Sequence, residues 1–292
     1  KRYLFHILCF LYISACNASS LIIINFISRQ NSLTPFKIEA TQASILASPI
    51  DDSVATVMLV HGHKGSALTS LNPMVKDAIL RTENLNVIVV DWSEYARLSY
   101  TIAAGVVDAV ANDLATFTNM LITNTNIKAE ELHFVGFDLG AHVAGIAGRV
   151  MKAGWMRRTV SRITGLDPSG KEWGSNSARL TVTDARYVEV IHTDGNGIFA
   201  NGLGTAIGWV DFFANGGGSQ PGCLTHSCSH NRAYELFAAS MTNPKLVGYP
   251  CSSTTQLNLN LCRGDPLRMG TTALHKTGLG VYRINTRRSY PF

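Results

Sequence analysis

Three residues of this chain have the types and the order that nucleophilic catalysis uses, with one substitution. Asp138 lies between two glycines in the stretch VGFDLGAHVAG, where a strand is predicted to turn sharply into a helix. A turn of this kind, with the pattern G-x-S-x-G, presents a serine nucleophile. Asp167 follows in GLDPSG and His230 in CSHNRA. The order of turn residue, acid and histidine predicts a catalytic arrangement in which Asp138 stands where serine is expected.

Asp138 changes the chemistry that this arrangement can perform. A serine hydroxyl attacks once a histidine removes its proton, whereas a carboxylate has no proton to lose at neutral pH. We expect Asp138 to point toward the backbone N–H groups of His63 and Leu139, which would form an oxyanion hole. His230 would then lie between two carboxylates, which favour imidazolium, and a protonated histidine cannot act as a general base. The sequence thus predicts that Asp138, His230 and Asp167 form an ion triad, and that this triad fills the reaction centre.

Apolar strands and helices alternate along the part of the chain that holds these residues. Strands are predicted over residues 54–63, 86–92, 131–137, 162–168, 187–195 and 277–285. Helices are predicted over residues 67–82, 100–123 and 140–154, and residues 193–228 are predicted to be a glycine-rich loop region. This alternation indicates an α/β fold, with a mostly parallel central sheet and helices on both faces. Ligand sites in such sheets lie at the carboxyl ends of the strands.

Seven stretches of the chain resemble the pancreatic-lipase-type secreted lipases, and most closely the phospholipase A1 and insect yolk-protein branch of that family. They are VMLVHGH, VIVVDWSEYA, HFVGFDLGAHVAG, ITGLDPSG, VEVIHTDG, DFFANGG followed by QPGC, and CSHNRA. The resemblance implies an α/β-hydrolase fold, with the catalytic triad at Asp138, Asp167 and His230 and its serine replaced. Long members of the family carry a C-terminal β-sandwich. Because this chain ends at Phe292, we expect no such domain.

The resemblance also bears on access to the site. In the family, the loop between two disulfide-bonded cysteines covers the site as a lid. Only four residues, Leu224 to Ser227, separate Cys223 from Cys228 here. Four residues are too few for a mobile cover, so we expect an open site without interfacial activation.

The first residues of the chain predict export. A basic pair, Lys1-Arg2, precedes an apolar run, and small residues follow it. This pattern is typical of a secretory signal peptide. We therefore expect residues 1–18 to be a signal peptide, residues 19–292 to be the lipase-like domain, and the protein to be secreted and extracellular.

The cysteines fit an exported protein. Two of the six would leave with the signal peptide, and four remain: Cys223, Cys228, Cys251 and Cys262. An even number in an exported chain suggests two disulfides. Their order along the chain favours the local pairs Cys223–Cys228 and Cys251–Cys262.

Charge and spacing argue against several kinds of partner. A formal net charge of +5 over 292 residues, with only short basic pairs, argues against nucleic-acid binding. The cluster of His226, Cys228 and His230 lacks the paired C-x-x-C spacing of a structural zinc site. Asp194 supplies a single carboxylate to its glycine turn, which is a poor calcium site. We expect no cofactor, no metal and no stable membrane span.

The expected function is that of a secreted lipase-like protein that is catalytically inactive. It would bind a lipid or another apolar ligand, or act in storage. Two alternatives remain open. One is an active carboxyl-ester hydrolase of the triacylglycerol lipase or phospholipase A1 type. The other is a hydrolase that uses Asp138 as its nucleophile, as elbow aspartates do in attacking saturated carbon.

Overall fold

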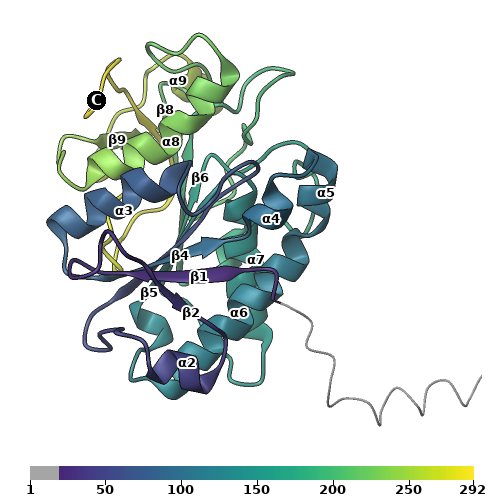
Figure 1. The fold of residues 1–292 in the computed structure, drawn as a ribbon. Helices are drawn as coiled ribbons and strands as arrows, with labels where there is room; N and C mark the ends of the chain where they lie inside the picture. Colours follow the sequence, from purple (N-terminus) through teal and green to yellow (C-terminus); the bar gives the residue numbers. More distant parts are fainter. Residues whose placement is uncertain (1–19) are drawn as a thin grey trace, which may run out of the picture.

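The computed structural model describes residues 20–292, so the predicted signal peptide lies outside the described residues. Within this part of the chain, eleven strands form one sheet in the order β10-β9-β11-β8-β7-β6-β5-β3-β4-β1-β2 (Figure 1). Neighbouring strands from β11 to β4 are parallel, and the strands at the two edges pair antiparallel. The predicted α/β fold with a mostly parallel sheet is confirmed.

The central strands are buried along their whole length. The strands are β1 (Ile23–Ile27), β2 (Phe36–Ile38), β3 (Thr56–Val60), β4 (Asn86–Asp91), β5 (Leu132–Phe137), β6 (Arg162–Leu166), β7 (Tyr187–His192), β8 (Val210–Ala214), β9 (Val247–Pro250), β10 (Leu267–Arg268) and β11 (Gly280–Ile284). Every residue of β3, β5, β6, β7 and β8 is buried. Strands covered on both faces need mostly apolar sequences, such as TVMLV in β3.

Helices form a layer on each face of the sheet. They are α2 (Gln42–Leu46), α3 (Leu71–Thr82), α4 (Ser93–Ala96), α5 (Tyr100–Gly105), α6 (Val107–Asn124), α7 (Leu139–Ala153), α8 (His226–Ser240) and α9 (Thr254–Asn258). α2, α6 and α7 share one hydrophobic core with the sheet, and α3 and α8 share the other. The site described below lies where the parallel strands end, between these two layers.

Three predictions about local structure differ from the structure. The single helix expected over residues 100–123 is two helices, α5 and α6, separated at Val106. Gly105 ends α5, and glycine is a poor helix former because its backbone loses the most freedom on folding. The region expected to be loops, residues 193–228, contains β8, whose apolar residues pair with both β7 and β11. The predicted helix over 67–82 begins at Leu71, later than expected.

Both predicted disulfides are present, joining Cys223 to Cys228 and Cys251 to Cys262. Across residues 20–292, every helix is too short or too polar to span a membrane.

Candidate active site

Asp138 lies at a sharp turn between β5 and α7. Its backbone has φ 55° and ψ −122°, a conformation that residues other than glycine rarely adopt. Close packing holds the turn, since a Cβ on Gly136 would clash with the carbonyl oxygen of Gly140, and a Cβ on Gly140 would clash with that of Val60. The turn therefore presents the Asp138 side chain to a cavity at the carboxyl end of β5.

Asp167 directly follows β6 and holds the histidine in place. Its Oδ2 lies 2.6 Å from Nδ1 of His230, and its Oδ1 accepts the backbone N–H groups of Thr193 at 2.7 Å and Asp194 at 3.1 Å. The carboxyl group is fully buried. With both oxygens engaged, the carboxylate fixes the orientation of the His230 ring, which lies near the start of α8.

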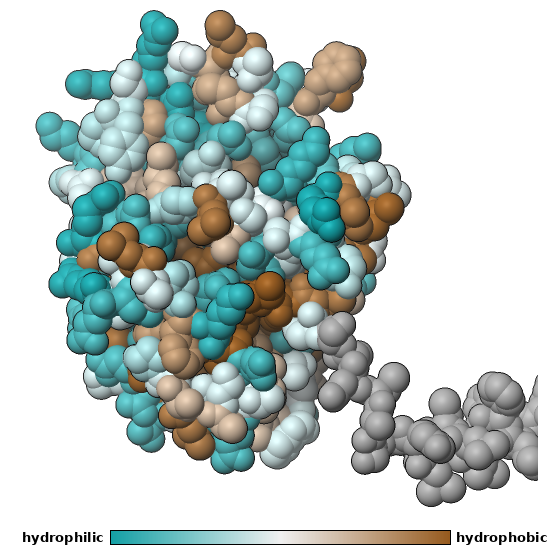
Figure 2. Space-filling view, in the orientation of Figure 1, coloured by the Kyte–Doolittle hydropathy of each residue, from teal (hydrophilic) through white to brown (hydrophobic). Residues whose placement is uncertain are grey.

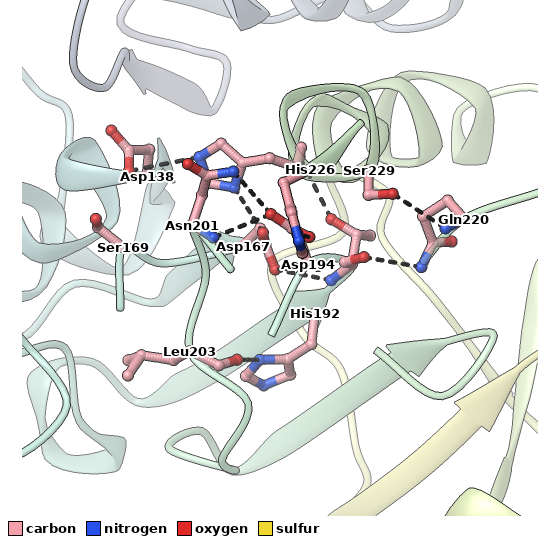
Figure 3. A network of polar contacts seen from close by, with 12 residues as sticks. Asp138, Asp167, Ser169, His192, Asp194, Asn201, Leu203, Gln220, His226 and Ser229 are labelled. Carbon is pink, nitrogen blue, oxygen red and sulfur yellow. Dashed lines mark hydrogen bonds and ion pairs between the residues drawn. The ribbon is translucent and has the colours of Figure 1, made fainter. Parts of the chain in front are cut away.

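Asp138 contacts the opposite side of the same ring. Its Oδ1 lies 3.4 Å from Nε2 of His230, and its Oδ2 accepts the backbone N–H of His63 at 2.8 Å. Asp138 is only 6% exposed. The structure thus brings Asp138, Asp167 and His230 together in one line of contacts (Figure 3).

The two carboxylates keep His230 charged. Burial alone would lower the pKa of His230, but the hydrogen bonds and charges of Asp138 and Asp167 outweigh it and raise the pKa to about 10. Burial alone would raise the pKa of Asp138. The hydrogen bond and charge of His230, with the backbone N–H groups of Leu139 and His63, instead hold it below its usual value. At neutral pH the site therefore holds an imidazolium between two carboxylates.

The predicted oxyanion donors face the protein's own carboxylate. The N–H of His63 donates to Asp138, and the N–H of Leu139, at the start of α7, also favours the charged form of that carboxyl group. Donors of this kind stabilise negative charge that develops on a substrate oxygen. In this arrangement, Asp138 already supplies that charge.

A second acid–histidine pair lies beside the first, and the sequence analysis did not predict it. Nδ1 of His226 is 2.6 Å from Oδ1 of the buried Asp194, whose Oδ2 accepts the backbone N–H and the side-chain amide of Asn201 at 3.0 and 2.8 Å. Asp194 also donates its backbone N–H to Asp167. The pair therefore ties the loop after β7 to the start of α8 (Figure 3). The only sequence signal was the position of His226, four residues before His230.

The Cys223–Cys228 loop forms the start of a helix. Oγ1 of Thr225 accepts the backbone N–H of Cys228 at 3.2 Å and so caps α8. His226 begins the helix and is held by Asp194. Two contacts therefore hold this short loop, the Thr225 cap and the pair of His226 with Asp194.

A cavity of about 900 Å³ opens above Asp138 and His230. Aromatic and aliphatic side chains form part of its wall: Phe137, Tyr234, Leu203, Ile198 and Phe199. Ile198 and Phe199 are 91% and 75% exposed, at the rim. Its volume falls within the range of about 300–1,000 Å³ that is typical of small-molecule sites.

Asp167, Asp194 and His230 lie close enough together to face one metal ion. Their polar atoms are already engaged, however. Nδ1 of His230 contacts Asp167, Nε2 faces Asp138, and Asp194 is held by His226 and Asn201. Cys228, which the zinc alternative required, is bonded to Cys223. These contacts fit a network of ion pairs better than a metal centre.

Comparisons with known proteins give one consistent result. A family model described as Lipase matches residues 21–275. The chain is 36% identical over 234 residues to pancreatic lipase-related protein 2 of Cavia porcellus, covering 77% of this chain and 52% of that protein. It is 31% identical over 251 residues to pancreatic triacylglycerol lipase of Homo sapiens, covering 77% and 53%. It is 32% identical over 272 residues to lipoprotein lipase of Homo sapiens, covering 84% and 55%. The chain spans about half the length of these curated relatives.

Proposed function

The chain belongs to the lipase family, and from this premise we propose that it is a secreted lipase-like protein that does not hydrolyse esters and binds a lipid or another apolar ligand. The observation that carries the proposal is the position of the Asp138 carboxylate. Its two oxygens reach the backbone N–H of His63 and the ring of His230. A fixed carboxylate therefore stands where the attacking group and the developing oxyanion of ester hydrolysis would have to be.

The proposed loss of activity has two independent physical causes. Removing the nucleophile of a serine hydrolase costs on the order of a million-fold in rate, and the residual rate comes from the oxyanion hole and substrate binding. Here the donor from His63 is also engaged by Asp138. In addition, the raised pKa of His230, about 10, leaves no free base to activate a water molecule at neutral pH.

Ligand binding is supported by the cavity that remains above the ion triad. Its wall includes apolar side chains from three segments, represented by Phe137, Leu203 and Tyr234. Polar groups line much of the rest of the cavity, and some of them are fixed: Ser169, for example, is bonded to Tyr100 at 2.8 Å. A concave, partly apolar surface with a few oriented polar groups is typical of binding sites for small apolar molecules. Storage of such a ligand is compatible with this arrangement.

Export is supported by the two disulfides, since such bonds persist mainly in oxidising compartments. The basic and apolar first residues support the same proposal.

One observation favours a second candidate, a hydrolase in which Asp138 attacks saturated carbon. The strained turn is kept, and it still presents a carboxylate oxygen to the cavity. In that reaction an Asp138 oxygen would bond to the carbon of a haloalkane, and the carbon–halogen bond would break to release halide. Since His230 is charged at neutral pH, activation of water is expected to be slow, so the ester of Asp138 would build up before its hydrolysis. Mass spectrometry after incubation with a 1-haloalkane would reveal that adduct, and its absence would remove this candidate.

The proposed function is tested by two measurements on the purified native protein. The first is hydrolysis of a short-chain chromogenic ester and of phosphatidylcholine, where no turnover above the background is expected. The second is extraction and mass spectrometry of bound lipid, with about one apolar molecule per chain expected. Phe199→Asp, at the cavity rim, should lower the amount recovered, and the exposed Lys245→Gln serves as the control. A native protein that carries no lipid and takes up none would contradict the binding part of the proposal.

A further inference from the structure

The loop after β7, residues 193–204, forms part of the wall of the cavity above the ion triad. This loop projects from the molecule, and hydrophobic side chains stand at its tip (Figure 2). Ile198 and Phe199 at the tip are largely exposed, so little packing holds the tip in place. The position of the loop therefore depends on contacts at its base.

The buried carboxylate of Asp194 holds the base of this loop. Its Oδ2 accepts the backbone N–H of Asn201 at 3.0 Å and the side-chain amide of the same residue at 2.8 Å. The backbone carbonyl oxygen of Asp194 accepts the N–H of Gly202 at 3.0 Å. Its Oδ1 lies 2.6 Å from Nδ1 of His226, which is the only ion-pair partner of Asp194 among residues 20–292. His226 thus supplies the one counter-charge of this carboxylate in the described chain.

The backbone at the base of the loop holds the ion triad in turn. The N–H groups of Thr193 and Asp194 donate to Oδ1 of Asp167 at 2.7 and 3.1 Å. The other oxygen of Asp167 orients the ring of His230. A shift of residues 193–194 would therefore weaken the two hydrogen bonds that fix Asp167, and the ring of His230 would lose its orientation.

His226 is the exposed member of this chain of contacts. Its side chain is 42% exposed, whereas those of Asp194 and Asp167 are 1% and 0% exposed. If His226 lost its contact, the carboxylate of Asp194 would be buried without a charged partner. Because an unpaired buried charge is costly, this carboxylate would turn toward solvent or take up a proton. Either change would alter the contacts that hold the base of the loop.

The short disulfide loop brings His226 to this point. The bond between Cys223 and Cys228 closes the loop, and Oγ1 of Thr225 caps α8 by accepting the N–H of Cys228 at 3.2 Å. His226 is the first residue of α8, so the cap and the crosslink together fix its position. A loop that is too short to cover the cavity can still hold a histidine in place.

We propose that His226 is a positioning residue for the ion triad, and that the short disulfide loop serves to present it. His226 holds the side chain of Asp194, the backbone of Asp194 holds Asp167, and Asp167 holds the ring of His230. The proposal rests on the ion triad that the proposed function also uses, but not on the absence of ester hydrolysis. A failure of one can therefore be distinguished from a failure of the other.

Proton NMR of the His230 ring tests the proposal, because it reports the contact with Asp167 without requiring turnover. In the wild type, the proton on Nδ1 of His230 should exchange slowly with water, since the 2.6 Å contact is buried. His226→Leu removes the hydrogen bond to Asp194. It should speed up this exchange about tenfold or more, the size expected when a hydrogen bond to a charged group is lost.

Two further variants separate positioning from general stability. His226→Asn retains an N–H donor close to the place of Nδ1, so it should restore slow exchange. Leu224→Ala changes a fully exposed residue of the same loop and is the matched control, with exchange expected to stay slow. Slow exchange in His226→Leu would overturn the proposal, even if its melting temperature fell. So would fast exchange in His226→Asn or Leu224→Ala, since the effect would then not depend on the contact with Asp194.

Removal of each disulfide tests the role of the loop itself. Cys223→Ser/Cys228→Ser should speed up exchange of the same His230 proton, in the direction of His226→Leu. Cys251→Ser/Cys262→Ser removes the disulfide that closes the segment around α9, and it should leave the exchange as in the wild type. Equal exchange in the two double variants would overturn the role proposed for the short disulfide loop.

Discussion

The backbone N–H of His63 donates a hydrogen bond of 2.8 Å to Oδ2 of Asp138, although 75 positions separate the two residues in the chain. The donor follows β3 and the carboxylate follows β5, and the parallel pairing of these strands brings their ends together. The protein's own carboxylate thus competes with any substrate oxygen for this donor. Replacing this one side chain should change the protonation, the stability and the reactivity of the site together.

The protonation of His230 can be observed directly. In the wild type, nitrogen-detected NMR of the imidazole ring should show His230 as imidazolium from about pH 5 to pH 8, because its pKa is raised to about 10. In Asp138→Ser, one of the two neighbouring carboxylates is gone, so the pKa of His230 should fall. A neutral His230 at pH 7 in the wild type would contradict the ion triad.

His142 provides an internal control in the same titration. Burial lowers the pKa of His142 to about 4, partly offset by its hydrogen bond to the carbonyl oxygen of Ser169. Its ring should remain neutral from about pH 5 to pH 8, the range in which His230 is expected to be charged. Two buried histidines of one protein would then differ in charge at the same pH. An error in the pH of the sample would affect both rings alike and could not produce this difference.

The ion triad should also make stability depend on pH. The pKa of His230 is raised from 6.5 to about 10, so its contribution is complete below about pH 6.5 and is lost as the pH rises toward 10. The pKa of Asp138 lies below 3.8, so its contribution is present above that pH and is lost as the pH falls further. The wild type should therefore exceed Asp138→Asn in stability most clearly between about pH 4 and pH 6.5.

Urea unfolding of both proteins measures this difference. We expect the free energy of unfolding of Asp138→Asn to be lower by about 1.5–3 kcal/mol at about pH 6, the range for a hydrogen bond to a charged group, and the gap to narrow by about pH 9. A gap of constant size from acid to alkaline pH would show that Asp138 stabilises the fold by packing alone.

The tight turn at Asp138 should not tolerate a side chain at its glycines. A Cβ on Gly140 would clash with the backbone carbonyl oxygen of Val60, and backbone cannot move away cheaply. Gly140→Ala should therefore cost about 2–4 kcal/mol of unfolding free energy, as other severe clashes in cores do. Gly105→Ala is the matched control, since no heavy atom lies within 4 Å of a Cβ there. Equal stability of the two variants in thermal unfolding would refute the close packing of the turn.

Local patterns predicted the elements that have a distinctive sequence, and they missed those that depend on pairing or on the surrounding chain. The apolar runs that became β3, β4 and β5 are buried on both faces, so their composition alone indicates strands. β8 has the same kind of sequence, VDFFA, but glycine-rich loops flank it, and only its pairing with β7 and β11 makes it a strand. The break between α5 and α6 at Val106 follows Gly105, a poor helix former, and helical periodicity alone does not register it.

The residues of the candidate site were also predicted only in part. Asp138, Asp167 and His230 were predicted because each lies in a recognisable local motif. The pair of Asp194 and His226 was missed, since its partners are 32 residues apart and meet only when the loop after β7 reaches α8.

The most direct test of the central claim, that Asp138 disables an otherwise intact site, is an ester-hydrolysis assay of purified wild type and Asp138→Ser. A short-chain chromogenic ester and phosphatidylcholine are suitable substrates, and Asp138→Ser/His230→Ala is the control for each. We predict no turnover by the wild type, measurable turnover by Asp138→Ser, and its loss when His230 is also replaced. Turnover by the wild type that His230→Ala abolishes would contradict the claim and would show that Asp138 takes part in catalysis.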